Sequence, residues 1–353
     1  MIKNFDEVFE DVTKRGTKIK TDEYRLSGKH QIIDQGQEQV AGYTDLEDGV
    51  FENIPAIIFG DHTRIVKYID KPFFLGADGV KVLRSRFQDA NYRYLYYALK
   101  YVKIPNTGYN RHFKWLKESK IQYPCAEKQE EIVSVLNGVS KIIEYRQQQL
   151  QKLDELVKAR FIELFGDPMT DISKWSTSTI GEQFNVTSGG TPATGEKAYW
   201  ENGTIPWIGS NMCQDTILSG NDGKFITEEG YTHSSAKWFH KGTVLVALVG
   251  ATIGKTALLR FDTTTNQNIA AIDVNNNVAF SSEFVFYHMQ MLYSKFMEIG
   301  SGKFKMANQG FIRQLPLICP PIELQDQFAA FVEQTDKSKS VVQKALDEAQ
   351  LLF

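Results

Sequence analysis

The feature that most constrains this chain is an internal repeat, because its second half resembles its first. The segment YPCAEKQEEI (123–132) aligns with CPPIELQDQF (319–328). In this alignment three residue types recur at the same spacing: Pro124 and Pro320, Glu127 and Glu323, Gln129 and Gln325. Chains that repeat in this way fold as successive copies of one unit, so the two halves are expected to share a fold.

Three earlier pairs of segments recur in the same order. They are NFDEVFEDVTKRGTKI (4–19) with TIGEQFNVTSGGTPA (179–193), NIPAIIFGDHTRIVKYID (53–70) with KGTVLVALVGATIGKTALLRFD (241–262), and NYRYLYYALKYV (91–102) with SEFVFYHMQMLY (282–293). The second half is the longer one. The two copies are therefore expected to be related but not identical.

The segment GATIGKT (250–256), which follows the apolar run VLVALV, raises the alternative of a nucleotide-binding phosphate loop. That loop requires four residues between its first glycine and the Gly-Lys-Thr, whereas three separate Gly250 from Gly254 and Val249 occupies the required position. The first copy has FGDHTRIV at the same place, so a hairpin common to both copies is the preferred interpretation. Lys255 is then a basic residue at a turn, suited to contact a backbone phosphate of another molecule. A nucleotide-binding assay distinguishes the two readings.

Each copy has two parts of different composition. Residues 1–123 and 174–318 contain short β-branched runs such as AIIFG and TVLVALVG between glycine turns, which is typical of strands. Residues 124–165 and 319–353 begin near a proline and then largely lack glycine and proline, which is typical of long helices. Residues 166–173, with a glycine and a proline, form a linker. The predicted fold is α+β: two mixed α/β domains separated by two long antiparallel coiled-coil helices, with pseudo-two-fold repetition.

Residues at steps of three or four, occasionally seven, form a stripe along each helical segment. In the first segment these are Ile132, Val135, Val139, Ile142, Arg146, Leu150, Leu153, Val157 and Leu164. In the second they are Phe328, Val332, Thr335, Val342, Leu346 and Ala349. Matching stripes predict an antiparallel helix pair. A helix over 127–165 would be about 58 Å long, which exceeds the width of one domain, so it is expected to bridge two domains.

Composition limits the class of protein. A length of 353 residues is enough for about two domains, and the net charge of −3 argues against a uniformly basic nucleic-acid-binding surface but permits local basic loops. No stretch is apolar for the roughly 20 residues of a membrane span, and the start MIKNFDEVFEDV does not resemble a signal peptide. Cys125, Cys213 and Cys319 lie far apart and form no metal-type pair. A reduced, cytoplasmic setting is expected.

The chain resembles the specificity (S) subunits of type I restriction–modification systems over essentially its full length. The strings that carry the resemblance are GGTPATGEKAYWENGTIPWIGSNM (189–212), GTVLVALVGATIGKTALL (242–259), NQNIAAI (266–272), PPIELQDQF (320–328) and, in the first half, GKHQIIDQGQEQVAGYTD (28–45). The alternation of recognition domain, spacer helix, recognition domain and spacer helix agrees with it. A recognition subunit of another class of restriction–modification enzyme remains an alternative.

The resemblance implies a subunit without catalytic activity. Each recognition domain would bind one half of a split, asymmetric site in double-stranded DNA, with the helices holding the halves apart. The helices would also dock two methyltransferase subunits that use S-adenosylmethionine. Restriction subunits that use ATP and magnesium would complete the enzyme, and this chain would bind no cofactor or metal itself.

Enzymatic alternatives have weak support in the residues. CPPI (319–322) places Cys319 where an amino-methyltransferase motif needs an amide or acid, and Ile322 where it needs an aromatic ring. The acidic residues Asp45, Glu47 and Asp48 are typical of a turn rather than of a nuclease metal site. Trp200 and Trp207, which flank a turn, are expected to be packing residues rather than base-stacking residues.

Candidate DNA contacts lie on polar, glycine-containing loops, because Arg, Lys, Asn and Gln contact base edges while Lys, Ser and Thr contact phosphates. In the first domain these candidates are Lys14, Arg15, Lys18, His62, Arg64, Asn110, Arg111 and Lys114. In the second they are Thr191, Lys197, Ser210, Asn211, Lys255, Lys303, Lys305, Asn308 and Gln309. The bases that are recognised do not follow from these residue types.

Overall fold

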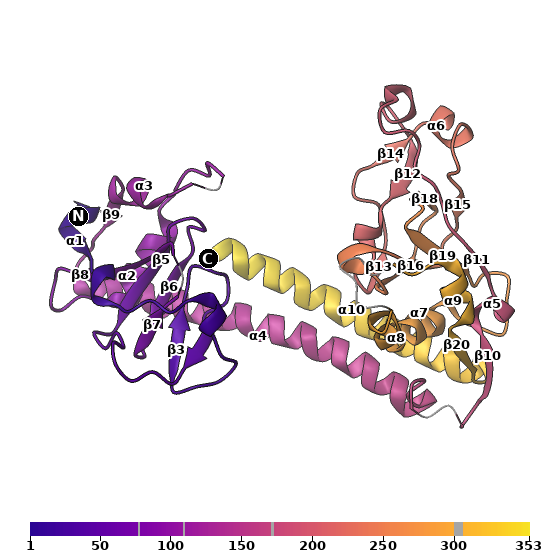
Figure 1. The fold of residues 1–353 in the computed structure, drawn as a ribbon, viewed down its shortest axis with the longest axis horizontal. Helices are drawn as coiled ribbons and strands as arrows, with labels where there is room; N and C mark the ends of the chain where they lie inside the picture. The colour runs from indigo at the N-terminus through magenta and orange to yellow at the C-terminus, as the bar shows by residue number, and fades with distance from the viewer. Residues whose placement is uncertain (77, 109, 171–172, 300–305) are drawn as a thin grey trace. The chain divides into compact units, whose positions relative to one another are not determined.

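The computed structural model describes residues 1–76, 78–108, 110–170, 173–299 and 306–353. The chain divides into two compact units (Figure 1). Unit 1 comprises Met1–Glu144 together with Glu348–Phe353, and unit 2 comprises Tyr145–Asp347. Helix α4 (Ala126–Phe165) is continuous across the boundary between the two sets of residues, as is helix α10 (Ile322–Leu352).

The described part of unit 1 contains three small sheets. The largest has the order β2 (Phe9–Asp11), β8 (Val80–Ser85), β5 (Ala56–Gly60), β6 (Val66–Ile69), and all of its neighbours are antiparallel. The others are β4 (Gly42–Thr44), β3 (His30–Ile33), β7 (Phe73–Leu75) and the pair β1 (Ile2–Asn4), β9 (Lys120–Gln122). All five residues of β5 are buried, and helix α2 (Tyr92–Tyr101) packs on this sheet through Leu95 and Leu99.

The described part of unit 2 repeats this plan with additional strands. Its main sheet has the order β11 (Asn185–Thr187), β19 (Ile269–Asp273), β16 (Val244–Ala247), β17 (Thr256–Leu259), β13 (Thr216–Leu218). A second sheet has the order β14 (Phe225–Ile226), β12 (Ile205–Ile208), β18 (Thr263–Thr265), β15 (Trp238–Phe239), and β10 (Ser176–Thr179) pairs with β20 (Pro316–Cys319). Helix α7 (Ser282–Met291) packs on the main sheet.

Short helices and turns connect these elements. The α-helices are α1 (Phe5–Val8), α3 (Phe113–Lys117), α5 (Ile180–Gln183), α6 (Glu228–Thr232), α8 (Tyr293–Met297) and α9 (Gln309–Gln314). The 3-10 turns are η1 (Thr13–Arg15), η2 (Thr21–Glu23), η3 (Lys197–Tyr199), η4 (Ser210–Met212) and η5 (Gly250–Thr252).

The predicted repeat is present in the topology. The order β2-β8-β5-β6 in unit 1 recurs as β11-β19-β16-β17 in unit 2. The first strand of each copy pairs with the strand that precedes the long helix, as β1 with β9 and β10 with β20. The common hairpin is confirmed as β5 with β6 and as β16 with β17, both antiparallel.

The repeated proline and glutamine have a structural cause. Gln129 Nε2 donates a hydrogen bond to the carbonyl oxygen of Pro124 at 3.0 Å, and Gln325 Nε2 donates to that of Pro320 at 2.9 Å. Each hydrogen bond joins the first turn of a long helix to the proline that precedes the helix. In the second copy Gln325 also accepts from the backbone N–H of Ser281 at 2.9 Å, which ties the start of α10 to the start of α7.

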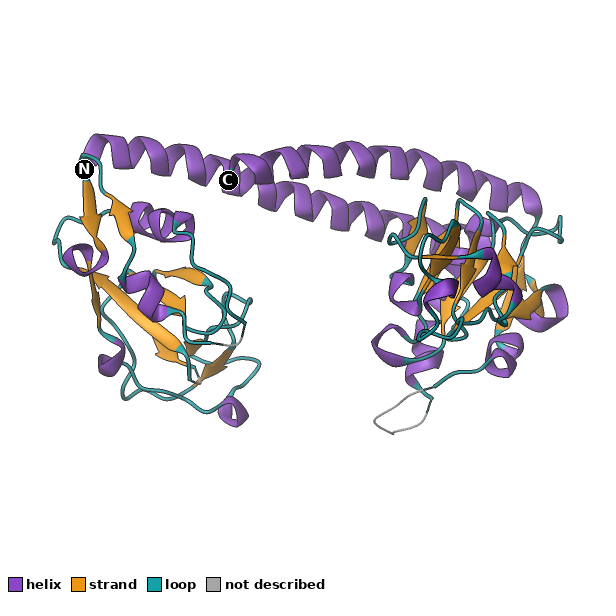
Figure 2. Cartoon of the chain, turned by 90° about the horizontal axis from the view of Figure 1, so that it is seen from above, coloured by secondary structure: helices purple, strands orange, loops and turns teal. Residues whose placement is uncertain are grey.

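Helix α10 lies alongside the C-terminal part of α4 and runs antiparallel to it (Figures 1 and 2). Lys339 Nζ lies 2.7 Å from the Asp154 carboxylate, while the Phe161 and Phe328 rings lie 5.5 Å apart. Higher residue numbers in α4 thus meet lower numbers in α10. The predicted stripe of α10 is buried at every position: Phe328, Val332, Thr335, Val342, Leu346 and Ala349.

The predicted stripe of α4 is only partly right. Val157 is buried, and so are Phe161 and Phe165, which the stripe did not include. Val135 and Ile142 are instead 61% and 49% exposed. A periodic apolar pattern predicts that a face is suited to burial, but it does not identify the surface that covers the face. In the part of the chain that the structure describes, no residues bury Val135 and Ile142, so this part of α4 is exposed.

Candidate nucleic-acid interface

In unit 1 the structure brings the loop after β5 and the loop before α3 together at Asp61. The backbone oxygen of Asp61 accepts from the N–H of His112 at 2.7 Å, and its Oδ1 accepts from the N–H of Phe113 at 2.8 Å. The Asp61 N–H donates to the carbonyl of Gly79 at 2.7 Å, in the turn before β8. Because Asp61 is buried, these three bonds hold the loops in one arrangement.

The loop that contains η1 reaches the same turn. Lys18 Nζ lies 2.7 Å from Asp78 Oδ1, one residue before Gly79. The hydrogen bond and charge of Lys18, together with the charge of Arg111, hold the pKa of Asp78 below its ordinary value. All three loops predicted for the first domain therefore converge around one acidic turn.

The side chains of the first-domain candidates differ in how much they are engaged. Lys14, Arg111 and Lys114 are exposed, and Lys114 Nζ lies 4.1 Å from the Trp115 ring centroid. Arg15 lies 3.6 Å from the Glu10 carboxylate.

Three further candidates make hydrogen bonds within the domain, Asn110 and Arg64 through their side chains and His62 through its backbone N–H. Asn110 Nδ2 donates to the carbonyl of Thr107 at 2.5 Å. Arg64 has a left-handed backbone (φ 62°) and its guanidinium lies 3.5 Å from the carbonyl of Ile104. His62 is half-buried, and its N–H donates to the Gln35 side chain at 3.1 Å. Arg64 and His62 are therefore held in place more firmly than Lys14 or Arg111.

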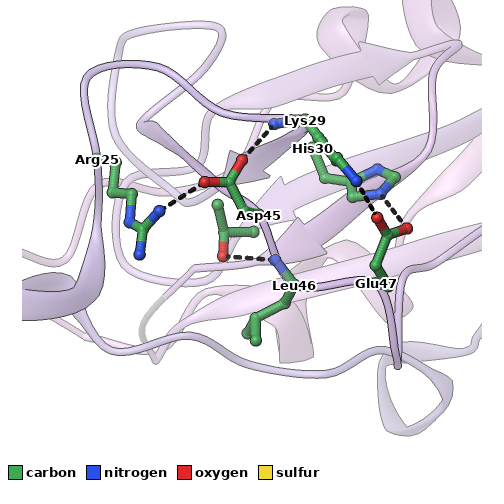
Figure 3. A network of polar contacts seen from close by, with 7 residues as sticks. Arg25, Lys29, His30, Asp45, Leu46 and Glu47 are labelled. Carbon is green, nitrogen blue, oxygen red and sulfur yellow. Dashed lines mark hydrogen bonds and ion pairs between the residues drawn. The ribbon is translucent and has the colours of Figure 1, made fainter.

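A second charged cluster, which the sequence did not predict, lies on the opening segment of the first domain (Figure 3). Arg25 pairs with Asp45 at 2.5 Å, and the backbone N–H of Lys29 donates to the same carboxylate at 3.1 Å. The Lys29 ammonium pairs with Glu47, which raises the pKa of Lys29 and lowers that of Glu47. His30 Nε2 lies 3.9 Å from Glu47. The cluster was missed because the partners are separated by 16 to 20 residues.

In unit 2 the Gly-Gly-Thr-Pro segment is a site of close packing. A Cβ on Gly189 would collide with the carbonyl oxygen of Thr265, and a Cβ on Gly190 would collide with Ser235. Trp207 Nε1 donates to the carbonyl of Gly190 at 3.1 Å and packs edge-on against Trp200, with ring centroids 5.2 Å apart. Both tryptophans are packing residues, as predicted, and the glycines let the segment reach β18.

This packing places Thr191 beside the turn between β18 and β19. Thr191 Oγ donates to Gln267 Oε1 at 2.6 Å, across 76 residues of sequence. Polar and apolar residues then line one surface hollow: Ser188, Gly189, Leu248, Val249, Gln267, Asn268, Met306, Ala307, Asn308 and Gln309. The preceding Asn266 donates its N–H to the carbonyl of Ile208 at 3.1 Å, next to η4. The tripeptide Asn-Gln-Asn was the signal in the sequence that could have identified Gln267.

Two of the predicted amides in this hollow serve internal bonds. Asn308 is the N-cap of α9 and its Oδ1 accepts from the N–H of Phe311 at 2.9 Å. Gln309 Nε2 donates to Ser188 Oγ at 3.0 Å, and its Oε1 lies 3.3 Å from the Arg313 guanidinium. Both residues are thus positioned at the hollow by the fold itself.

The other candidates of the second domain are dispersed. Lys197 is exposed and lies 3.7 Å from Glu201, Ser210 is half-buried, and Asn211 is exposed. Lys303 and Lys305 lie outside the described residues.

Lys255 does not lie at a free turn tip. Its ammonium is 2.5 Å from the Asp215 carboxylate and 4.8 Å from the Tyr293 ring centroid, and the side chain is 34% exposed. Asp215 also accepts from the N–H of Thr256 at 3.0 Å. Asp215 immediately precedes β13, which pairs with β17 in parallel. Strand β13 has no counterpart in the described main sheet of unit 1. The first copy therefore gave no indication of this partner.

The phosphate-loop alternative is wrong. After η5 the chain passes through Gly254 (φ 76°) directly into strand β17. A phosphate loop instead needs a helix whose N-terminal N–H groups point at the anion. The ammonium of Lys255, which such a loop would direct to a phosphate, is paired with Asp215.

The described residues form neither a membrane-spanning helix nor a metal-binding group. None of their helices is long and apolar enough to cross a membrane. In the same part of the chain, no three His, Cys, Asp or Glu side chains are grouped as a metal site requires.

Comparisons with known proteins agree with the repeat. Residues 1–155 and 172–350 each match the family described as type I restriction modification DNA specificity domain. The chain is 24% identical over 284 residues to the type I restriction enzyme EcoR124I/EcoR124II specificity subunit of Escherichia coli, covering 77% of this chain and 69% of that protein. It is 33% identical over 138 residues to the type I restriction enzyme MjaIX specificity subunit of Methanocaldococcus jannaschii, covering 37% of this chain and 31% of that protein.

The fold has a counterpart among solved structures. The crystal structure of the type I restriction–modification system S subunit from M. genitalium superposes with a TM-score of 0.56 at 18% identity, covering 100% of this chain and 93% of that chain. Two copies of the family domain account for nearly the whole sequence and for the repeated strand order. The chain therefore belongs to the type I restriction–modification DNA specificity family, and it is a DNA sequence-specificity subunit.

Proposed function

We propose that this subunit binds a bipartite DNA site, with one half recognised by each copy of the domain. The proposed domains are residues 1–123 and 174–318, joined through spacer helices at 124–165 and 319–353 and a linker at 166–173. The observation that carries the proposal is one strand order in two copies whose loops bear different side chains. A common framework with different loops is suited to two different half-sites, because base edges are distinguished by the donors and acceptors presented to them.

In the first domain the DNA-contacting surface is proposed to be the cluster of loops around Asp78. Its candidates are Lys14, Arg15, Lys18, His62, Arg64, Asn110, Arg111 and Lys114. Lys14, Arg111 and Lys114 have basic, exposed side chains, which favours contacts to phosphates. Arg64 is held by its backbone conformation and by Ile104, which favours a more specific contact.

In the second domain the surface is proposed to be the hollow at Gln267 with the adjoining loops. Its candidates are Thr191, Lys197, Ser210, Asn211, Lys255, Lys303, Lys305, Asn308 and Gln309. The polar side chains at the hollow itself are amides and a hydroxyl, which favours hydrogen bonds to base edges. Lys255 is the least suited of the set, because a phosphate would have to replace Asp215 as its partner.

The long helices are proposed to separate the two half-sites and to dock two methyltransferase subunits. A helix of 40 residues is about 60 Å long, which is long enough to separate two DNA contacts by more than one turn of the duplex. The exposed apolar residues Val135, Ile142 and Tyr145 of α4 are suited to a protein partner. This subunit would catalyse nothing, and S-adenosylmethionine, ATP and magnesium would bind to the methyltransferase and restriction subunits.

The test is to exchange residues 174–318 for the corresponding segment of another member of the family. The methylated sites are then mapped in DNA from cells that carry the chimera and its methyltransferase. One half of the methylated sequence is expected to change completely while the other half stays the same. A chimera that alters both halves, or neither, would contradict the assignment of one half-site to each domain.

A further inference from the structure

Gln267 combines three properties that no other side chain of the second-domain hollow shares. It is exposed, it lies in the turn between two strands of different sheets, and its amide is oriented by another side chain. Asn308 and Gln309 line the same hollow, but their side chains are engaged in capping α9 and in bonding Ser188. Within the described residues, the amide nitrogen of Gln267 donates to no protein acceptor.

The orientation of the Gln267 amide comes from Thr191. The hydroxyl of Thr191 donates to Gln267 Oε1 at 2.6 Å, which occupies one of the two lone pairs of that oxygen. The second lone pair and both N–H groups of the amide remain available for a ligand. A glutamine held in this way presents one acceptor and one donor side by side.

The position of Thr191 is fixed in turn by the close packing of its neighbours. Gly189 abuts the carbonyl of Thr265 with no room for a side chain, and the carbonyl of Gly190 accepts from Trp207 Nε1. Thr265 is the last residue of β18, two residues before Gln267. The Gly-Gly-Thr segment and the Asn-Gln-Asn turn therefore form one rigid unit, which is the arrangement that specific recognition requires.

The geometry points to Gln267 as a side chain that recognises adenine in the major groove, with Thr191 as its positioning residue. An amide that offers an acceptor and a donor side by side matches adenine, whose N6 amino group donates and whose N7 accepts. This inference rests on the proposed function, since it assumes that the second domain contacts DNA bases. It adds the identity of one recognising residue and of the base that it selects.

The experiment compares the methylated sequence produced by the wild-type subunit, with its methyltransferase, to that produced by variants at Gln267. In Gln267→Ala, one adenine position of one half-site is expected to become degenerate, while the other positions stay the same. Preference for adenine there is expected to fall by about fivefold to a hundredfold, the value of one bidentate contact. Gln267→Glu is expected to move the preference at that position toward cytosine, because a carboxylate accepts from the cytosine N4 amino group.

Thr191 is tested with a pair of variants that separates positioning from packing. Thr191→Val removes the hydroxyl but keeps the shape, and it is expected to relax the same adenine position less than Gln267→Ala does. Thr191→Ser keeps the hydroxyl, so it is expected to restore the wild-type preference. Equal sequence preference of Thr191→Val and wild type would overturn the positioning role.

Asn276→Ala, at an exposed amide in the turn after β19 that donates to the Asp273 carboxylate at 2.7 Å, is the matched control and is expected to leave the methylated sequence unchanged. If a variant methylates too little DNA to map, its complex is assayed for binding to duplexes that carry each of the four bases at every specified position. An unchanged order of preference in Gln267→Ala and Gln267→Glu would overturn the inference. A wild-type subunit that yields no two-part methylated sequence would instead contradict the proposed function.

Discussion

The two copies of the domain share a framework but present different chemistry at their candidate surfaces. In the first copy, cations are paired with nearby carboxylates, as in Lys18 with Asp78 and Arg25 with Asp45. In the second copy, the polar side chains at the hollow are neutral amides and hydroxyls that bond to one another or to their neighbours, as Gln267 does to Thr191. The difference shows that the shared framework determines the positions of the loops but not the side chains on them.

The copies also differ in how they use the long helices. The core of the second copy includes Phe161 and Phe165 from α4 and Phe328 from α10. Among the described residues, α4 contributes to the core of the first copy only the partly buried Ile132 and Val133. The second copy is therefore expected to depend on the helices for its stability to a greater extent than the first.

The largest predicted effect tests this difference in helix packing. Phe161 is fully buried, and its ring lies within 5.6 Å of the rings of Phe165, Phe284 and Phe328. Phe161→Ala is expected to lower the free energy of unfolding by about 3–5 kcal/mol, because it removes a large buried side chain and leaves a cavity. Ile142→Ala, at the exposed part of the same helix, is expected to change it by less than about 0.5 kcal/mol. Urea unfolding of both variants measures the contrast, and equal losses would show that α4 packs alike along its length.

The second prediction concerns the pH dependence of stability. Helix α2 of the first copy and helix α7 of the second are each bonded to the strand that precedes a long helix, but through different side chains. In the second copy, buried His288 bonds the carbonyl of Pro316 in β20 at 2.8 Å, and burial lowers the pKa of His288 to about 4. In the first copy, the Tyr94 hydroxyl donates to the carbonyl of Gln122 in β9 at 2.7 Å. A tyrosine hydroxyl loses its proton only in base, and burial raises the pKa of Tyr94 further, so the hydrogen bond of Tyr94 is unaffected by acid.

The sign of the His288 effect follows from where protons bind. Between about pH 6.5 and pH 4 the unfolded chain protonates this histidine while the folded chain does not, so stability is lost as the pH falls. The loss from this group is expected to reach about 2–3 kcal/mol by pH 4.5. His288→Asn should remove that part of the pH dependence of urea unfolding, and His233→Asn, at an exposed histidine, should retain it. Equal pH dependence in His288→Asn and wild type would contradict the assignment.

The smallest predicted effect tests the charge pairing of the first copy. Asp78→Asn leaves Lys18 without its carboxylate partner and removes the negative charge near Arg111. Affinity for a non-specific duplex is expected to rise by less than tenfold, and the slope of log affinity against log salt is expected to steepen by about 0.9 for each cation that gains a phosphate. Glu333→Gln on α10 makes the same change in net charge at an exposed helical pair with Lys337 and serves as the control. An equal response of the two variants would show that Asp78 has no special relation to DNA binding.

Much of the framework could be predicted from the sequence, because its signals are local or repeated. The stripe of α10 was right at every position, and the repeated proline and glutamine make the same hydrogen bond in both copies. The hairpin at Gly250 was right for the same reason, since the first copy contains it too. These features depend on residues that are close in sequence or on the alignment of one copy with the other.

The sites were harder to predict, because they depend on pairs of residues far apart in sequence. The turn at Gly254 predicts a free cation at Lys255, but its partner Asp215 lies 40 residues earlier, next to strand β13, which has no counterpart in the described main sheet of the first copy. Gln267 was overlooked, although its turn was noted, because its partner Thr191 lies 76 residues away. The periodic pattern of α4 likewise could not show that Val135 and Ile142 lack a covering surface within the described chain.

The central claim is that two unlike recognition domains are held apart by a stiff helical spacer. The most direct test inserts four residues into each long helix at the sequence boundary between the two compact units, after Glu144 in α4 and after Asp347 in α10. Each insertion adds about 6 Å, so the unspecified gap in the methylated sequence is expected to lengthen by about two base pairs with the flanking bases unchanged. A changed base in either half-site, or a gap of the original length, would contradict the claim.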